Sequence, residues 1–422
     1  MLSKQVRSMK RASRWTLVAA VAAAGAAVPA VALAGFDYGT ISYTDVADTF
    51  AASSYSQVVG FPAINNAGQV AFSMLTRGNV QHVYVTPLSG SALINVADTA
   101  TGFTGMSSVT LNNGGTAVFG ATRSNGPNAN HAGIFSGRGG VVTTVADSTT
   151  ATKPYFSGGT PRISDGGATV FLGVGASGWP QITVQQGGAY SNVVAYNGSQ
   201  FEGLYDAAIN NSGQVGFITD DYSTGRNNGA FIYRANPGGS PVKIARAFTT
   251  TSVAINDASV MAFEAAAGTG NGFPPTGIAT SDGLTTTFIS QVGHFLPGTH
   301  ILIDSYAANG QGTPINNAGL VALQGSDSTF ANYGIYVGDG VKTQTIVRVG
   351  QSLFGKTVKD FGLGRDAIND DGQITFSVLF TDNTSAVVIT TGVSAVPEPG
   401  TAVMLSLGGV ACLAIRRRRA RA

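Results

Sequence analysis

A nine-residue pattern of apolar and polar positions recurs along the chain. Its first copy starts at Ile64, continues through Asn65 and Gly68, and ends in the apolar pair Ala71 and Phe72. The later copies are Leu111–Phe119, Ile163–Phe171, Ile209–Phe217, Ile255–Phe263, Ile315–Leu323 and Ile368–Phe376. Because successive copies start 46 to 60 residues apart, the period is typical of a solenoid, a propeller or another repeat array.

Each copy predicts two short strands joined by a tight turn. Asparagine bonds to its own backbone in such turns, and glycine allows a positive φ. We therefore expect structural turns at five asparagine–glycine pairs: Asn65 and Gly68, Asn112 and Gly115, Asn210 and Gly213, Asn316 and Gly319, and Asn369 and Gly372. Serine replaces the asparagine at Ser164 and the glycine at Ser259. Such replacements suit a structural turn better than a catalytic residue.

The strand count predicts a closed ring. A third apolar segment follows every copy and a fourth follows the first six, whereas an additional strand, Ile41–Ala47, precedes the first copy. If that strand completes the seventh sheet, no sheet edge stays exposed. We therefore predict an all-β fold, a seven-bladed β-propeller of four-stranded antiparallel blades closed by the N-terminal strand. A parallel β-helix is the alternative, but it needs shorter coils and leaves Ile41–Ala47 unexplained.

Both ends of the chain predict processing. Five basic residues up to Arg14 precede an apolar stretch and the small-residue site Ala32-Leu33-Ala34, the pattern of a secretory signal peptide. We assign residues 1–34 to this signal, with an uncleaved membrane anchor as the alternative. Residues 35–395 are then the repeat propeller, and residues 396–422 a separate C-terminal signal.

The C-terminal signal has three ordered parts. Pro397, Glu398 and Pro399 come first, then the apolar segment Thr401–Ile415, and then the arginines Arg416, Arg417, Arg418 and Arg419. The apolar segment predicts a short transmembrane helix of about 22 Å, and the arginines would keep its end in the cytoplasm. An ordinary tail anchor is the alternative.

This arrangement resembles the PEP-CTERM sorting signal of Gram-negative bacteria. The resemblance implies recognition and cleavage near Pro397-Glu398-Pro399 by an exosortase, with transient anchoring in the membrane and display at the cell surface or outside the cell. The nine-residue unit also resembles the NxxGxxAF tandem repeat of bacterial surface proteins, which Asn65, Gly68, Ala71 and Phe72 match fully. That second resemblance implies no established enzymatic activity.

Composition narrows the class of protein. Glycine accounts for 57 of 422 residues and charged residues for 11%, against roughly 25% charged in an average domain. Ten of the 24 basic residues lie in the two terminal segments, so 14 basic and 21 acidic residues leave the body at −7. Because nucleic-acid binding relies on a basic surface, we expect no nucleic-acid partner. Cys412 is the sole cysteine, which excludes an intrachain disulfide and a cysteine-built zinc site.

A ligand site is expected at one end of the propeller. The connections there are long and dissimilar: Thr122–His131, Gly173–Pro180, Asp220–Gly229, Ala265–Thr276 and Gly293–Gln311. Variable loops on a rigid scaffold often carry binding residues. The candidates are Asp220, Asp221 and Tyr222, whose oxygens could hold calcium, and Trp179, which could stack on a sugar ring. Solvated loop acids and an aromatic residue packed on its own loop are the alternative interpretations.

Enzyme signatures are scarce in the sequence. Gly173–Gly178 matches a dinucleotide fingerprint formally, but it runs into Trp179-Pro180 rather than a helix. The four histidines are scattered without metal-ligand spacing. We therefore predict no cofactor, no metal and no catalytic residue, and a non-catalytic surface or matrix protein that binds exopolysaccharide or surface proteins. A polysaccharide lyase or hydrolase on the same scaffold is the alternative, and a passive coat component is a third hypothesis.

Overall fold

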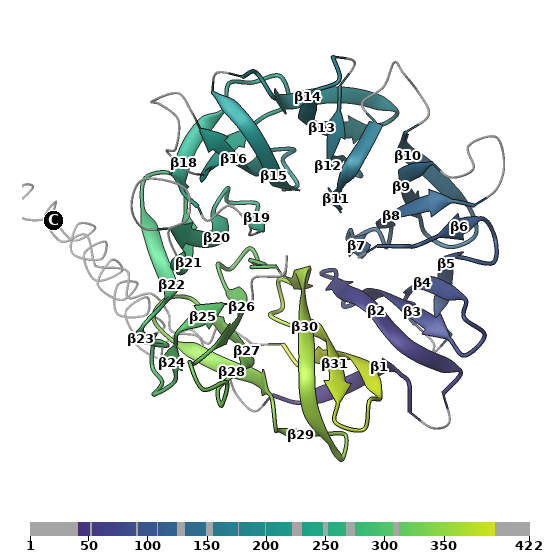
Figure 1. The fold of residues 1–422 in the computed structure, drawn as a ribbon, viewed down its shortest axis with the longest axis vertical. Coiled ribbons are helices and arrows are strands. Elements are labelled where there is room, and N and C mark those ends of the chain that lie inside the picture. The colour runs from purple at the N-terminus through teal and green to yellow at the C-terminus, as the bar shows by residue number, and fades with distance from the viewer. Residues whose placement is uncertain are drawn as a thin grey trace, which may run out of the picture. The chain divides into compact units, whose positions relative to one another are not determined.

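The chain folds as a ring of seven β-sheets around a central axis (Figure 1). The structure is a computed structural model. It describes residues 41–392 except 51–52, 90–91, 108, 125–130, 149–154, 176, 199, 222–229, 248–251, 267–274 and 307–311. The predicted signal peptide and the C-terminal signal with its helix lie outside the described residues. No helix in the described part has the length and hydrophobicity needed to cross a membrane.

Each blade is a four-stranded antiparallel sheet in chain order from the axis outward. Blade 1 consists of β2 (Tyr55–Ile64), β3 (Val70–Thr76), β4 (Gln81–Val85) and β5 (Ile94–Asp98). In blade 2 the innermost strand is divided into β6 (Phe103–Thr104) and β7 (Val109–Leu111), which both pair with β8 (Ala117–Arg123), and β9 (Ala132–Gly137) and β10 (Val142–Asp147) follow. Blade 3 consists of β11 (Tyr155–Ile163), β12 (Thr169–Val174), β13 (Pro180–Gln186) and β14 (Ala189–Ala195). The repeat turns join the first two strands of each blade.

The remaining blades follow the same order. Blade 4 consists of β15 (Phe201–Ile209), β16 (Val215–Asp221), β17 (Ala230–Ala235) and β18 (Val242–Arg246), and blade 5 of β19 (Val253–Ile255), β20 (Met261–Ala266), β21 (Pro275–Ser281) and β22 (Thr286–Gln291). Blade 6 consists of β25 (Ser305–Tyr306), β26 (Val321–Ser326), β27 (Gly334–Gly338) and β28 (Thr343–Arg348). Blade 7 takes only its three inner strands from this part of the chain, β30 (Lys356–Ile368), β31 (Ile374–Phe380) and β32 (Ser385–Thr390), and the two-residue β29 (Ser352–Leu353) forms a hairpin with β30. A small hairpin of β23 (His294–Phe295) and β24 (Leu302–Ile303) precedes blade 6.

The N-terminal strand closes the ring, as the strand count predicted. Strand β1 (Tyr43–Asp48) pairs antiparallel with β32, and its register runs from Tyr43 opposite Thr390 to Asp48 opposite Ala386. The seventh blade therefore takes its outermost strand from the opposite end of the chain. The predicted seven-bladed propeller with four-stranded blades is confirmed.

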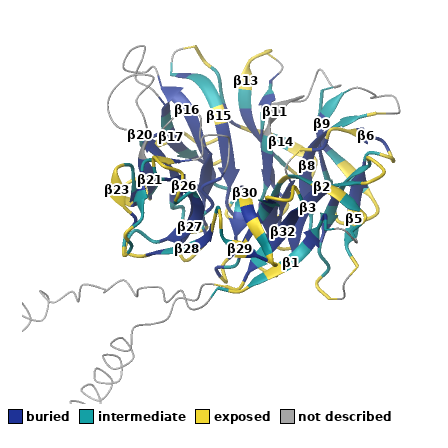
Figure 2. Ribbon diagram, turned by 60° about the horizontal axis from the view of Figure 1, so that its bottom comes forward, coloured by how far each residue is buried: buried dark blue, intermediate teal, exposed yellow. Residues whose placement is uncertain are grey.

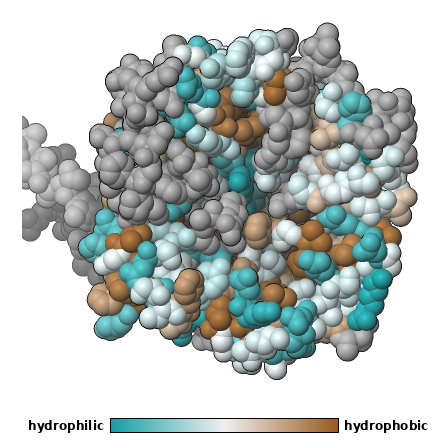
Figure 3. Space-filling model, in the orientation of Figure 1, coloured by the Kyte–Doolittle hydropathy of each residue, from teal (hydrophilic) through white to brown (hydrophobic). Residues whose placement is uncertain are grey.

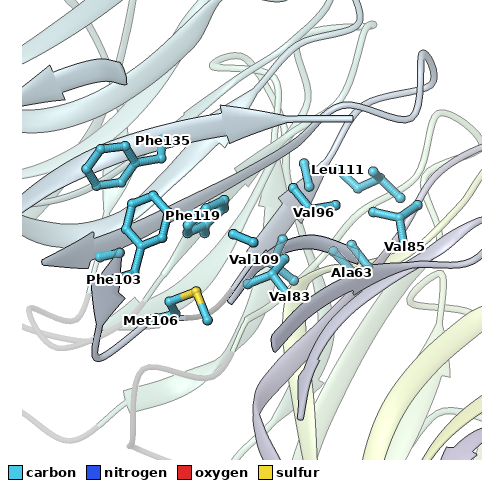
Figure 4. Close-up of a cluster of buried hydrophobic side chains, with 14 residues drawn as sticks. Ala63, Val83, Val85, Val96, Phe103, Met106, Val109, Leu111, Phe119 and Phe135 are labelled. Carbon is cyan, nitrogen blue, oxygen red and sulfur yellow. The ribbon is translucent and has the colours of Figure 1, made fainter. Parts of the chain in front are cut away.

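The apolar positions of the repeat fill the space between blades. The last residue of the unit is at most 1% exposed in every blade, as Phe72, Phe119, Phe171, Phe217, Phe263, Leu323 and Phe376. Figure 4 shows one such layer, where Val83 and Val96 of blade 1 meet Val109 and Phe119 of blade 2. Because each sheet buries both faces against its neighbours, the strand centres are buried and exposure concentrates at strand ends and turns (Figure 2).

Small residues let neighbouring sheets approach closely. Gly216 stands where most copies of the repeat carry alanine or valine, and a Cβ there would lie 2.5 Å from Cε of Met261 in the next blade. Met261 is fully buried. The sequence variation between copies is thus compensated across the blade interface, because a large residue in one unit faces a glycine in the preceding one.

Candidate functional site

The repeat turns lie together at one end of the axis, which we call the turn end; the opposite end, with the connections between second and third strands, is the loop end. In the first turn, Oδ1 of Asn65 accepts hydrogen bonds from the backbone N–H of Ala67 (3.1 Å) and of Gln69 (2.8 Å). Gly68 has a φ of +74°, which strains any residue with a Cβ. The side chain of Asn65 therefore fixes the turn shape.

The same asparagines tie neighbouring blades together. Nδ2 of Asn65 donates to the carbonyl oxygen of Asn112 at 3.0 Å, and Nδ2 of Asn369 donates to the carbonyl of Asn65 at 3.1 Å. Corresponding bonds start from Asn112, Asn210, Asn256 and Asn316. Ser164 of blade 3 has no amide and cannot form this tie. Six of the seven blade junctions are thus bridged by a buried side-chain amide.

A second ring of hydrogen bonds runs around the turn end, through the residue that follows each of these positions. We call it the turn belt: Asn66, Asn113, Asp165, Asn211, Asp257, Asn317 and Asp370. Each backbone N–H in the belt donates to Oδ1 of the next member at 2.7 to 2.9 Å, and the last bond, from Asp370 to Asn66, closes the circle. All seven junctions carry this bond, including the one between blades 7 and 1.

Acids and amides alternate around most of the turn belt. Oδ2 of Asp165 accepts from Nδ2 of Asn113 and of Asn211, both at 2.7 Å. Asp257 and Asp370 are each likewise placed between two asparagine amides. Because each carboxylate receives two side-chain donors and one backbone donor, its negative charge is stabilised without a cation.

Inside the turn belt, the channel narrows at a layer of aliphatic side chains. Ile209, Ile255, Ile315 and Ile368 separate an outer cavity of about 140 Å³, lined by the turn belt, from an inner cavity of about 100 Å³. These residues are the first position of the repeat unit. The pattern that builds the turns therefore also places apolar side chains between the two cavities.

Two ion pairs cross the axis next to this layer. Nη1 of Arg162 in blade 3 lies 2.5 Å from Oδ1 of Asp366 in blade 7, and Arg365 in blade 7 pairs with Asp206 in blade 4. The backbone N–H of Val253 in blade 5 donates to Oδ2 of Asp206 at 2.9 Å. Arg162 and Asp206 are almost fully buried, at 3% and 2% exposed. The charged groups thus connect blades 3, 4 and 7 across the channel, and the Val253 backbone adds blade 5.

The predicted acidic candidates do not face one ligand. Asp220 and Asp221 end strand β16 rather than starting a loop, because Asp220 pairs with Ala230 in the β-ladder. Asp220 accepts a hydrogen bond from the hydroxyl of Tyr205, whereas Asp221 accepts from the hydroxyl of Tyr233 and pairs with Lys243. Successive strand residues point to opposite faces of a sheet, so the two carboxylates have separate partners.

Burial shifts the pKa of one of these acids. It raises the pKa of the Asp220 carboxyl, the Tyr205 hydrogen bond opposes that rise, and the charge of Glu202 adds to it. Gly203 makes the contact with Tyr205 possible, since a Cβ there would lie 2.6 Å from the Tyr205 hydroxyl. Tyr222, the third candidate, lies outside the described residues. No group of three or more His, Cys, Asp or Glu that could hold a metal occurs in the described part of the chain.

Trp179 lies at the loop end of blade 3 and is half exposed. Its ring stacks on Tyr196 with centroids 4.6 Å apart and planes 22° apart, and 53% of the residue is accessible. The predicted aromatic residue therefore packs against its own blade and still presents surface to solvent. The predicted connection Gly293–Gln311 differs from a plain loop, because it contains the β23–β24 hairpin.

The sequence held a signal for the turn belt that the motif alone did not reveal. The position after the repeat asparagine is Asn or Asp in all seven copies, although the NxxGxxAF pattern leaves it open. The channel residues Arg162, Asp206, Arg365 and Asp366 carry no repeated signal, since each occurs in a single blade. Their pairing depends on which blades face each other across the ring.

Comparison with protein families identifies the C-terminal segment. Residues 395–419 match the family model of the PEP-CTERM protein-sorting motif, the segment that contains Pro397, Glu398, Pro399 and the arginines. The motif supports an exported, exosortase-sorted protein that has a C-terminal membrane anchor before processing. No curated protein matches the chain.

Solved structures share the fold. The β-propeller domain of the Trilobed protease from Pyrococcus furiosus, described as having an open velcro topology, is 9% identical with a TM-score of 0.50, covering 81% of this chain and 96% of that one. An oligogalacturonate lyase from Vibrio parahaemolyticus is 12% identical (TM-score 0.46, covering 85% and 98%), and a gluconolactonase from Xanthomonas campestris is 13% identical (TM-score 0.37, covering 81% and 99%). At this identity the similarity to the Pyrococcus furiosus domain concerns the fold alone, and none of the three similarities extends to activity.

Proposed function

We propose that this chain is a non-catalytic binding propeller displayed at the bacterial cell surface or in the extracellular matrix, where it holds a surface polymer. In this proposal residues 1–34 direct export, residues 35–395 are the displayed ring, and residues 396–422 are the sorting segment. The exosortase-sorted segment supports display outside the cytoplasm. The polymer that fits an exported protein with a body charge of −7 is a neutral exopolysaccharide, since like charge repels acidic polymers.

One observation carries the proposal. The charged side chains of the channel form ion pairs with each other: Arg162 pairs with Asp366, and Arg365 pairs with Asp206, across the axis. A carboxylate that acts on a substrate must face a position the substrate can occupy. Asp206 instead accepts both a guanidinium and the Val253 N–H. The network therefore supports a role in holding the ring rigid, with binding on the outer surfaces of the ring.

The turn belt supports the same role. A closed circle of hydrogen bonds through all seven blades resists opening of the ring when a bound polymer pulls on it, since opening at any junction breaks several bonds at once. The space-filling view in Figure 3 mixes hydrophilic, neutral and hydrophobic described residues rather than gathering one kind over a blade. Such a surface suits a soluble exported protein that binds hydroxyl-rich polymers through local sites.

Cosedimentation with insoluble polysaccharide tests this function. The processed protein would be purified from the producing cells and incubated with cellulose, chitin and the cells' own exopolysaccharide. We expect binding to at least one neutral polymer, with no release of reducing ends or unsaturated sugars. Release of such products would show a lyase or hydrolase, and the absence of binding to any polymer would contradict the proposal.

A further inference from the structure

A groove built from two blades lies at the ring seam. It has a volume of about 440 Å³ and is lined by β2 of blade 1 and by β30, β31 and β32 of blade 7. This size lies within the range of small-molecule sites, roughly 300–1,000 Å³. The groove is distinct from the axial channel, because the turn belt and the channel ion pairs do not line it.

A backbone bulge shapes the groove. The pairing of β2 with β3 shifts register between Val59 and Ala63, and Gly60 within that shift has a φ of +72°. The bulge moves Phe61 toward blade 7. Bulges of this kind redirect side chains and are frequent next to functional sites.

Two glycines of β30 allow the bulged residues of β2 to pack closely against the β30 backbone. A Cβ on Gly362 would lie 2.5 Å from the Phe61 ring, and a Cβ on Gly364 would lie 2.1 Å from the carbonyl oxygen of Pro62. Only glycine allows this approach, so Phe61 lies against the β30 backbone and forms one apolar wall. Val58 and Leu379 extend that wall. The groove is therefore built into the fold.

Polar side chains that can form further hydrogen bonds line the groove opposite its apolar wall. Gln57 is exposed, and its side-chain amide makes no hydrogen bond to another described residue. Asn383 accepts from Nζ of Lys359 at 3.1 Å through Oδ1, which leaves its Nδ2 as a donor. Asp360 is exposed and lines the groove. Its Oδ1 accepts the N–H of Phe361 at 2.8 Å, and the carboxylate also accepts from the Tyr333 hydroxyl. Because a carboxylate has about four acceptor positions, it can accept a further hydroxyl.

We infer that this seam groove binds a short neutral oligosaccharide. A sugar ring has apolar C–H faces and a rim of hydroxyls, so it needs an apolar wall opposite planar side chains that both donate and accept. Phe61 with Leu379 provides the wall, and Gln57, Asp360 and Asn383 provide the hydrogen-bonding groups. The groove holds one carboxylate and no cationic lining residue, which disfavours phosphate and acidic sugars. The inference rests on the proposed function and names the site and ligand class for it.

The test uses the processed protein, purified as for cosedimentation, and defined oligosaccharide probes. Binding of cellotriose, maltotriose and chitotriose would be measured by calorimetry and by ligand-observed NMR, with trigalacturonate as the acidic comparison. We expect at least one neutral trisaccharide to bind with a Kd of about 1 mM or tighter. Asp360→Ala and Gln57→Ala should each weaken it about tenfold. Asp371→Ala, which removes an exposed carboxyl of the same blade outside the groove, should leave it unchanged.

The possible results distinguish a failure of the groove inference from a failure of the proposed polymer-binding function. Gly362→Val, which places bulk against Phe61, should abolish trisaccharide binding; a thermal unfolding curve checks that this variant is folded. Should Gly362→Val not fold, the Gln57 and Asp360 variants still decide the matter. Binding that survives all groove variants, or no binding of any neutral trisaccharide, overturns the groove inference even where the protein still cosediments with a polymer. If the wild-type protein cosediments with no polymer, the proposed function itself is overturned.

Discussion

The backbone N–H of Asp370 donates a hydrogen bond of 2.9 Å to Oδ1 of Asn66, although 304 residues separate them. Nδ2 of Asn66 returns a bond of 2.6 Å to Oδ2 of Asp370. The pair closes the turn belt where blade 7 meets blade 1. At the outer edge of blade 7, β1 pairs with β32, so the seam is held both near the axis and at the rim.

Removing the belt bond at the seam should weaken the ring. Asn66→Ala eliminates both hydrogen bonds to Asp370, and we expect the free energy of unfolding to fall by about 1–2 kcal/mol. Chemical denaturation of the processed protein measures this change. Ala67→Ser, in the same turn but outside the belt, should change stability by less than about 0.5 kcal/mol. Equal stabilities for the wild type and Asn66→Ala would contradict a stabilising belt.

Removing the closing strand should have a larger effect. Deletion of Phe36–Val46 takes away most of β1 and exposes the edge of β32, so several backbone hydrogen bonds of about 1 kcal/mol each are lost. We expect the melting temperature to fall by about 5–10 °C. Tyr43→Phe, which removes the bonds of the Tyr43 hydroxyl to the Ile346 carbonyl and to Nε2 of Gln351 but keeps the strand, should give a small part of that drop. An unchanged melting temperature after the deletion would argue against ring closure by this strand.

Breaking one partner of a channel ion pair should destabilise strongly. Asp206→Ala removes the carboxylate that pairs with Arg365 and also leaves the Val253 N–H without its acceptor. Uncompensated buried charge typically costs about 3 kcal/mol or more. The double variant Asp206→Leu with Arg365→Met removes both charges and should recover much of the loss. Denaturation curves that place the single variant within about 0.5 kcal/mol of the wild type would show that the network does not hold the ring.

A buried carboxyl in blade 5 should make stability depend on pH. Burial raises the pKa of Glu264 from 4.5 to about 7. Because the folded state holds this proton more tightly than the unfolded chain does, stability from this group is complete below about pH 4.5 and is lost as the pH rises to about 7. The loss amounts to about 3 kcal/mol at most.

The variant Glu264→Gln isolates this effect. The difference in unfolding free energy between variant and wild type should grow in favour of the variant from pH 4.5 to pH 7 and level off above. Asp45 also has a pKa raised to about 7, chiefly by burial, but it is present in both proteins and cancels in the difference. Asp371→Asn serves as the exposed control. A pH-independent difference for Glu264→Gln would mean that the carboxyl is not buried in solution.

Sorting should depend on the Pro-Glu-Pro motif. We expect the double variant Pro397→Ala with Glu398→Ala to stay in the membrane unprocessed, because the exosortase-sorted segment matched at residues 395–419 loses its motif. Cell fractionation and immunoblotting measure size and location. Pro154→Ala, which removes a proline in the body of the chain, is the control and should be processed and located like the wild type. Normal maturation of the double variant would contradict exosortase recognition of this motif.

The fold was predictable because its signals are local and repeated. A turn such as Asn65–Gly68 is encoded by a few adjacent residues, and seven copies at similar spacing fixed the number of blades. The strand surplus at one end and the deficit at the other predicted the closure that β1 makes with β32. These features follow from backbone preferences and hydrophobic periodicity, which act over short stretches of chain.

The candidate sites were less accessible to prediction. The sequence predicts that Asp220 and Asp221 start one loop, whereas both end strand β16 and strand alternation gives them separate partners, Tyr205 and Tyr233. The seam groove was missed, because its Phe61 and Gly362 lie far apart in the sequence and belong to no motif. Nothing local marks either residue as part of a site.

Local patterns in the chain therefore specify the repeated module, the number of modules and the two ends that meet. Only the folded ring shows which single-copy residues are neighbours: Arg162 with Asp366 across the axis, and Phe61 with Gly362 across the seam. Closing a ring brings residues together through the order of blades and the register shifts of their inner strands. Both are set by packing summed over the whole circle, a quantity that no short segment encodes.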